Sequence, residues 1–173
     1  MSAQDPLKDH VGGRNIEHGS IDKVPDRFGN ANSALVCHNG FTGLLPPGVY
    51  FDPTTGGFTI MFWINILSLR NGWPTVLSFE SNNMIFGFYA FTSRLFIQSI
   101  SYGITYQYYT KTAVAFETWT HVAICVDGTE VKAYFNGVSQ EFDSEEGTNI
   151  GNNFKEGTNI CPYFCHFRRF DNN

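Results

Sequence analysis

The sequence has few charged residues and no long apolar run. Charged side chains make up 16% of its 173 residues, and the formal net charge is -5. A nucleic-acid partner requires clustered Lys and Arg to neutralise phosphates, and Arg168-Arg169 is the only adjacent basic pair. Nucleic acid is therefore excluded as an expected partner. Membrane insertion is excluded as well, because no stretch of about eighteen apolar residues occurs.

The sequence also lacks an apolar leader, a glycosylation sequon and helical periodicity. Residues 1–23 are polar, and Asn-x-Ser/Thr occurs nowhere, so neither feature settles the compartment. We expect residues 1–25 to form a polar, flexible leader and residues 26–173 to form one domain, belonging to a larger chain or assembly. Because no segment longer than ten residues has the apolar period of a helix, a helical fold is excluded.

Cysteine is sparse, and its state is open. The four cysteines permit two disulfides in three pairings, a single terminal disulfide, or free thiols. A zinc site is a further alternative, since His38, His121 and His166 could supply nitrogen ligands. The cysteines are Cys37, Cys125, Cys161 and Cys165.

Aromatic residues are abundant, at 16%, and turns separate short segments of apolar alternation. Residues 119–127 and 131–138 alternate around Asp127-Gly128, and Asn136-Gly137 follows. These dipeptides supply the positive φ of tight hairpin turns. Further strands are expected at 33–38, 58–67, 73–80, 84–91, 94–100 and 102–109. The pattern predicts an all-β fold, a two-sheet antiparallel β-sandwich.

Residues 58–67 form the strongest predicted strand, with one apolar and one mixed face. The mixed face contains Met61, Trp63 and Asn65 and is expected to point outward or toward a groove. Trp63 and Trp73 are nevertheless expected in the core rather than as sugar-stacking rings, because structural aromatic pairs are common on any sheet. The residues expected between the sheets are Phe58, Ile60, Phe62, Ile64, Val122, Ile124, Val126 and Phe135.

Several motifs, in order, resemble one known family. Trp119-Thr-His-Val-Ala, Tyr134-Phe-Asn-Gly and Asn149-Ile-Gly are similar to late strands of the laminin G-like jelly roll, in the concanavalin A-like lectin/glucanase superfamily. The segment from Asp26 to Leu35 resembles its entry sequence, and Phe167 to Asp171 stands at its closing strand. The resemblance implies a jelly roll and a non-catalytic module of an extracellular or cell-surface protein, binding glycan or protein in adhesion. A structural assembly domain without a small ligand is the alternative.

The enzyme alternative, a glycoside hydrolase, depends on an acidic run at residues 141–146. Family 16 glycoside hydrolases belong to the same superfamily, and their active strand carries three alternating acids similar to Glu141, Asp143 and Glu146. Here the intervening Ser144 and Glu145 are polar, whereas an active strand needs apolar anchors. We therefore expect a solvated acidic loop or an edge and no enzyme activity.

Two candidate binding sites remain. Asp26, Gly29 and Asn30 offer oxygen atoms in a compact turn. Asp171 lies near this turn if the first and last strands are neighbours, as the resemblance implies. These residues could bind calcium, or the turn could be a plain Asx turn without a metal. Tyrosines at alternate positions could stack on a sugar, or form cross-strand pairs instead. The candidate ligand contacts are Tyr102, Tyr106, Tyr108, Gln98 and Asn65.

Overall fold

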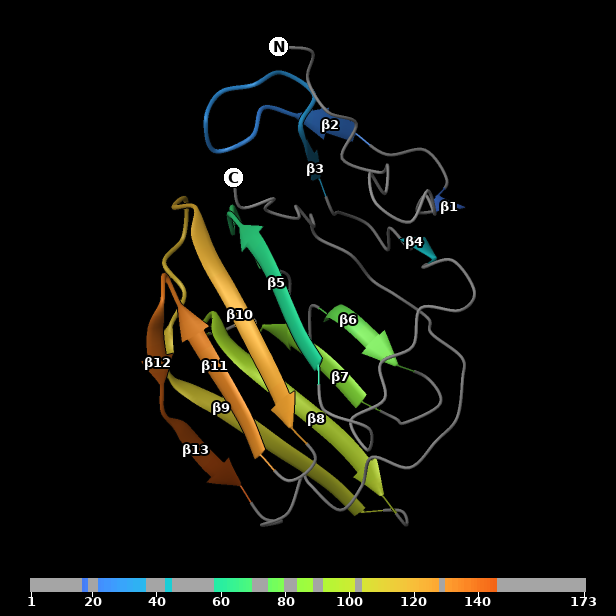
Figure 1. Ribbon diagram of the computed structural model, residues 1–173, viewed down its shortest axis with the longest axis vertical. Helices are drawn as coiled ribbons and strands as arrows, with labels where there is room; N and C mark the ends of the chain where they lie inside the picture. Colours follow the sequence, from blue (N-terminus) through green and yellow to red (C-terminus); the bar gives the residue numbers. More distant parts are fainter. Residues whose placement is uncertain are drawn as a thin grey trace.

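The chain folds into two facing antiparallel sheets, seen in a computed structural model (Figure 1). The structure describes residues 17–18, 22–36, 43–44, 58–69, 75–79, 84–88, 92–101, 104–127 and 130–145. Within these ranges every regular element is a β-strand, and no helix is long and apolar enough to cross a membrane. The predicted all-β, two-sheet antiparallel sandwich is confirmed.

The first large sheet has the strand order β12-β11-β10-β5, and the second has the order β13-β9-β8-β7-β6. The first consists of β5 (Phe58–Ile64), β10 (Thr120–Asp127), β11 (Glu130–Phe135) and β12 (Val138–Gln140). The second consists of β6 (Thr75–Phe79), β7 (Met84–Phe88), β8 (Arg94–Ser101), β9 (Ile104–Ala113) and β13 (Phe142–Glu145). In Figure 1 the strands of the four-stranded sheet cross in front of those of the five-stranded sheet.

Period-two alternation builds the core between the sheets. On β5, Ile60, Phe62 and Ile64 are buried, whereas Thr59 and Met61 are exposed. On β10, Val122, Ile124 and Val126 point to the same interior, where they pack with side chains of the other sheet such as Phe86 and Ile97. Burying each such side chain stabilises the fold by about 1.5–3 kcal/mol. Of the eight predicted core residues, seven are buried and Phe58 is partly buried against the cluster.

The Asn136-Gly137 turn forms as predicted. Asn136 and Gly137 have φ of 49° and 81°, and Phe135 pairs with Val138 across them. Two successive positive φ values are typical of the type I′ hairpin, whose twist matches that of the strands. The Asn136 side chain also accepts a hydrogen bond from the His121 backbone N–H at 2.9 Å, which ties the turn to the start of β10.

The described N-terminal part contains short strands, of which the sequence indicated only the one within residues 33–38. β1 (Glu17–His18) pairs with β4 (Gly43–Leu44), and β2 (Asp22–Val24) pairs with β3 (Ala34–Val36). Two of these strands, β1 and β2, lie in the segment expected to be a leader. They form although their local strand propensity is weak, because pairing with residues elsewhere in the chain overrides it. The boundary at residue 26 therefore stays a prediction, while paired structure begins before it.

Candidate ligand-binding surface

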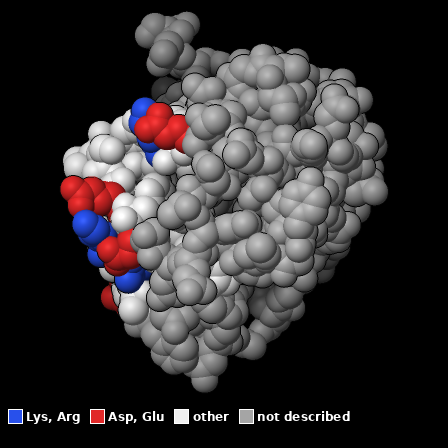
Figure 2. Space-filling view, turned by 90° about the horizontal axis from the view of Figure 1, so that it is seen from below, with Lys and Arg blue, Asp and Glu red and all other residues white. Residues whose placement is uncertain are grey.

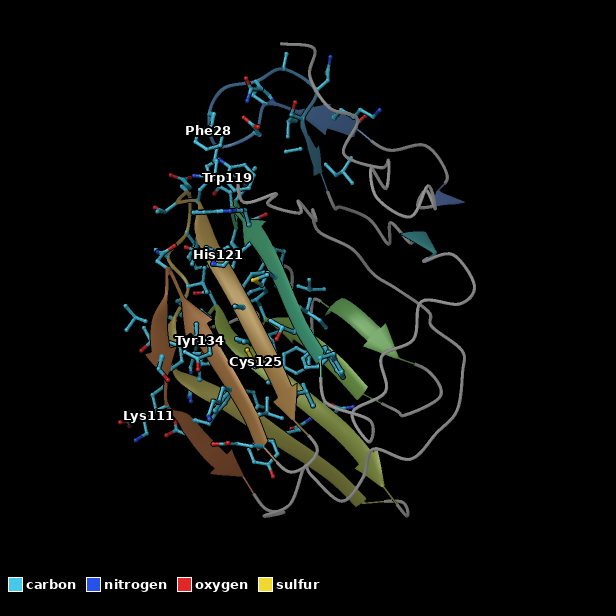
Figure 3. All side chains as sticks on the ribbon, in the orientation of Figure 1. Phe28, Lys111, Trp119, His121, Cys125 and Tyr134 are labelled. Atoms are coloured by element: carbon cyan, nitrogen blue, oxygen red, sulfur yellow. The ribbon has the colours of Figure 1, made fainter. Side chains whose placement is uncertain are left out.

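The outer face of the four-stranded sheet carries an aromatic and polar surface. Trp63 on β5 lies directly opposite His121 on β10, and Met61 lies opposite Ala123. On its other side, Ala123 pairs with Tyr134 on β11. Met61 is 50% exposed, while Trp63, His121 and Tyr134 are half-buried. Figure 3 shows His121 and Tyr134 on this sheet, with Phe28 and Trp119 beyond its upper end.

Trp63 is not in the core, so the expectation that it packs there is wrong. Its neighbours Phe62 and Ile64 occupy the inward positions of β5, and alternation turns Trp63 to the outer face. Its ring lies 5.2 Å from that of His121, tilted by 51°. Trp73 lies outside the described residues.

A loop between β2 and β3 closes one side of this surface through Arg27. The Arg27 guanidinium carbon is 4.0 Å from the Trp63 ring centroid and 3.7 Å from that of Phe28. Phe28 itself is 60% exposed. Cation–π contacts of this kind attach the loop to the sheet and leave an aromatic edge facing solvent. We call Arg27, Phe28, Met61, Trp63 and His121 the aromatic surface.

Asp26 fixes the conformation of that loop. Its carboxylate accepts hydrogen bonds from the backbone N–H groups of Phe28 and Asn30, at 2.9 and 3.0 Å, and from the Asn30 side chain at 3.0 Å. The Gly29 N–H donates to the Asp26 carbonyl, and Gly29 has a φ of 80°. This is the Asx-turn geometry named as the alternative to calcium.

The predicted calcium ligands are only partly described. Asp26, Gly29 and Asn30 lie together in this loop, whereas Asp171 lies outside the described residues. Both Asp26 carboxylate oxygens already accept protein hydrogen bonds. In the described part of the chain no three His, Cys, Asp or Glu side chains come together to hold a metal ion. Calcium at this loop therefore stays a prediction.

Electrostatics at the aromatic surface are set by Arg27 and by burial. The pKa of the His121 imidazole is lowered, first because the ring is partly removed from water and second because the Arg27 cation is near. Two hydrogen-bonding atoms here, Trp63 Nε1 and Asn65 Oδ1, are buried without a protein partner. Such atoms are uncommon in folded proteins, and these two lie beneath the surface rather than exposed on it.

The structure separates the predicted contacts onto different faces. Tyr108 packs against the core between the sheets, which favours a core role over a ligand contact. Gln98 points to the outer face of the five-stranded sheet, where Gln107 donates to it at 2.8 Å and Tyr109 donates to Gln107 at 3.0 Å. Asn65 follows β5 in the other sheet. Tyr102 and the side chain of Tyr106 lie outside the described residues.

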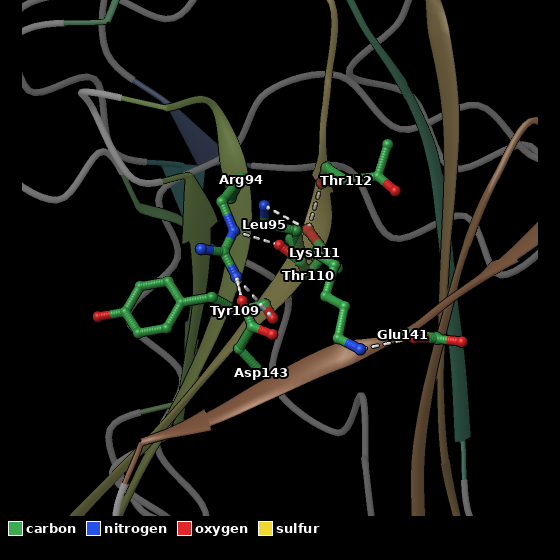
Figure 4. A network of polar contacts seen from close by, with 8 residues as sticks. All are labelled: Arg94, Leu95, Tyr109, Thr110, Lys111, Thr112, Glu141 and Asp143. Atoms are coloured by element: carbon green, nitrogen blue, oxygen red, sulfur yellow. Dashed lines mark hydrogen bonds and ion pairs between the residues drawn. The ribbon is translucent and has the colours of Figure 1, made fainter.

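The acidic run lies at a sheet edge, as predicted for its described residues. Glu141 precedes β13, an edge strand in the described sheet, and Asp143 lies within it, so the run contains a strand rather than only a loop. Asp143 pairs with Arg94 at 2.5 Å, and Glu141 pairs with Lys111 at 2.7 Å (Figure 4). Glu146 lies outside the described residues.

The Glu141–Lys111 pair shifts the carboxyl pKa away from what acid catalysis requires. The hydrogen bond and charge of Lys111 lower the pKa of the Glu141 carboxyl, and the same pair raises the pKa of Lys111. A glycosidase acid needs the opposite shift, a raised carboxyl pKa. Figure 2 shows acidic and basic side chains of the described residues lying beside one another on the visible face rather than in a patch of one sign.

Sequence reasoning missed Arg27, Phe28 and His121 as parts of one surface. His121 carried a usable signal, because it alternates with the buried Val122 and Thr120 and so had to face outward. Arg27 carried none, since only the folded chain brings its loop over Trp63. Cys125, the one cysteine in the described part, is a free thiol that accepts a 3.5 Å hydrogen bond from Thr59.

Comparison with known proteins identifies the fold. Residues 39–159 match the Laminin_G_3 family, described as the Concanavalin A-like lectin/glucanases superfamily. No curated protein is significantly similar to the chain. Domain 4 of AbnA, a GH43 extracellular arabinanase from Geobacillus stearothermophilus solved in complex with arabinotriose, has a TM-score of 0.65 at 19% identity, covering 92% of this chain and 82% of that one.

A protein from Bacteroides ovatus, named for carbohydrate binding, has a TM-score of 0.41 at 20% identity over 62% of this chain and 30% of its own. That likeness is too weak to carry an argument. The similarity to AbnA domain 4, at its low identity, shows a shared fold.

Proposed function

Because the chain belongs to the concanavalin A-like lectin/glucanases superfamily, with its jelly-roll sandwich, we propose that it is a non-catalytic carbohydrate-recognition domain of an extracellular or cell-surface protein. The fold it shares with AbnA domain 4, which was solved with arabinotriose, supports the proposal. AbnA is an extracellular enzyme, which supports the same compartment here.

The single observation that carries the proposal is the aromatic surface. Sugars present apolar C–H faces that stack on aromatic rings, and hydroxyls that bond to polar groups at the rim. Trp63 and Phe28 supply rings, exposed Met61 extends the apolar area, and His121 with Tyr134 supplies polar groups beside them. One ring contributes on the order of 1 kcal/mol, so several contacts are needed for useful affinity.

The sequence also predicted a second binding surface, a tyrosine ridge. Substitution tests whether its side chains contact ligand or pack in the interior. The ridge consists of Tyr102, Tyr106 and Tyr108, with Gln98. Replacing Tyr106 and Tyr108 together by Ala removes binding without lowering Tm if they are contacts. A large drop in Tm, which the packing of Tyr108 against the core favours, assigns them to the interior.

The hydrolase alternative is disfavoured by the ion pairs of Glu141 and Asp143. Retaining hydrolysis requires two carboxyl groups about 5 Å apart across a bound sugar, one of them with a raised pKa. Measurable hydrolysis of β-glucan, abolished in Glu141→Gln, would overturn the non-catalytic proposal.

A glycan array tests the proposal, with the purified domain applied with calcium and with a chelator. We expect at least one class of saccharide to bind, with loss in Trp63→Ala and retention in Val138→Ala. Val138 is the matched control, because it is 64% exposed on β12, at the other end of the same sheet. Binding that needs calcium would support the Asp26 loop as a metal site. An array without bound saccharide would favour a structural assembly domain.

A further inference from the structure

Arg27 and the imidazole of His121 both lie against the Trp63 ring. The His121 ring centroid is 5.2 Å from that of Trp63, and the Arg27 guanidinium carbon is 4.0 Å from the Trp63 centroid. The two side chains are therefore within about 10 Å of each other, a separation over which charges still interact in physiological salt. An aromatic ring attracts one cation through its quadrupole, but a second cation at the same ring is repelled by the first.

Backbone hydrogen bonds fix the place of His121 in the sheet. Its N–H donates to the Asn136 side chain and its carbonyl accepts from the Asn136 N–H, both at 2.9 Å. On the other side of β10, His121 pairs with Trp63 of β5. Protonation of the ring therefore adds a charge to the aromatic surface at a fixed position on the strand.

Neighbouring acids do not balance such a charge. Among the described residues, no carboxylate lies within ion-pair distance of His121. Asp26 accepts hydrogen bonds from its own loop, and Glu130 pairs with Lys132 at 3.0 Å. The described titratable and charged groups on the surrounding elements are Asp26 and Arg27 in the loop, Cys125 on β10, and Glu130, Lys132 and Tyr134 on β11.

The folded protein favours the neutral form of His121. Its pKa is lowered, first because the ring is partly removed from water and second because of the Arg27 charge. A saccharide lying on the aromatic surface removes more water from the same ring, so the first cause grows in the complex. When binding lowers the pKa of a basic group, affinity falls as pH drops through that pKa, because the free protein takes up the proton more readily.

We propose that protonation of His121 releases the saccharide, so that the domain binds at neutral pH and lets go in acidic surroundings. The proposal rests on the proposed function, because it names the regulation of the same surface. Affinity should be at its full value above 6.5, the ordinary pKa of histidine, and should fall below it. Arg27 lies outside residues 39–159, so the matched family segment does not supply this control by itself.

Titration calorimetry of the full chain at about pH 7.5 and about pH 4.5 tests the proposal. The probes are arabinotriose and the neutral saccharide retained most strongly on the glycan array, and the buffer contains a chelator, so that no metal contributes. We expect about three- to tenfold weaker binding at the lower pH, as repulsion between like charges gives in a partly solvated site. This ratio should fall to near one in His121→Gln, shrink in Arg27→Gln and persist in Val138→Ala.

NMR measures the pKa of His121 directly and does not depend on the His121 variant. The chain has five His residues, and the His121 ring signal is assigned through the backbone of β10. We expect its pKa to lie below 6.5 in the free chain, to fall further with saturating saccharide, and to rise toward 6.5 in Arg27→Gln. Circular dichroism in the same buffers confirms that the chain is folded at each pH used.

Three results would overturn the proposal. One is a His121 pKa that rises when saccharide is added, and another is tighter binding at the lower pH, as an imidazolium donating to sugar hydroxyls would give. The third is a pH ratio that is unchanged in His121→Gln. A purely structural His121 would lower Tm and weaken binding equally at both pH values, so the ratio separates the two roles.

The same measurements separate this proposal from the proposed function. If saccharide binds equally at both pH values and Trp63→Ala removes the binding, the proposed function stands and the control by pH is wrong. If no saccharide binds at either pH, both are wrong.

Discussion

Trp63 illustrates how alternation on one strand decides the role of a residue. Its ring is large and apolar, yet Phe62 and Ile64 occupy the interior positions on either side, so Trp63 faces outward. There it contacts Arg27 and His121 instead of core residues. The sequence placed Trp63 correctly on the mixed face, and only the expectation of a core role was wrong.

His121 should make stability depend on pH. Its folded-state pKa lies below the unfolded value of 6.5, because burial and the Arg27 charge disfavour the imidazolium. The unfolded chain therefore binds more protons between the two pKa values, and this contribution to stability is lost as pH falls below the unfolded pKa. Urea unfolding at several pH values measures this effect. As pH falls, the free energy of unfolding should decline less in His121→Gln than in wild type. Identical pH profiles would show that the shift is absent.

At the scale of elements, the strands were largely predictable and their ends were not. The predicted strand at 58–67 is β5, which ends at Ile64, and the strand predicted at 102–109 is β9, which extends to Ala113. The length of a strand depends on the strands it pairs with, and β9 pairs with β8 on one side and β13 on the other. Neither β2 nor its pairing with β3 has a local signal, because three residues cannot display periodicity.

Two glycines allow a matched test of the rim loop. Gly29 and Gly137 have nearly equal φ, 80° and 81°, and a Cβ added at either meets nothing within 4 Å. Substitution by Ala should therefore cost each about 1 kcal/mol through backbone strain alone. Thermal unfolding measures this cost. Gly29→Ala disturbs the loop that carries Arg27 and Phe28, whereas the Gly137 turn reaches the aromatic surface only through the His121 backbone N–H. Gly29→Ala should therefore weaken saccharide binding more than Gly137→Ala; equal binding by both variants would remove the loop from the site.

The site was less predictable than the fold, for a physical reason. Core residues can be recognised in the sequence because apolar side chains recur at every second position along a strand, as in β5 and β10. The aromatic surface unites the Arg27 loop with β5 and β10, and that contact arises only when the chain folds. The Tyr102 to Tyr108 alternation was real, but the sequence could not tell which face of the sheet is inside, and Tyr108 packs inward.

At the scale of the whole molecule, stability comes from the interior between the sheets. Phe62 and Met61 are adjacent on β5 but are 1% and 50% exposed. Phe62→Ala should lower the free energy of unfolding by about 3–5 kcal/mol, because it leaves a cavity, while Met61→Ala should cost less than about 1 kcal/mol. Urea titration followed by circular dichroism measures both. Similar losses would mean that the outer face is covered as fully as the core.

The central claim is that the outer face of the four-stranded sheet binds saccharide through Trp63. The most direct test follows the indole N–H signals by NMR while a saccharide selected on the array is added. The chain has three Trp residues, and Trp63→Phe assigns the signal of interest by its disappearance. We predict that the Trp63 indole signal shifts in a saturable way, with an affinity that matches calorimetry. Binding that moves the other indoles and leaves Trp63 unchanged would contradict the account.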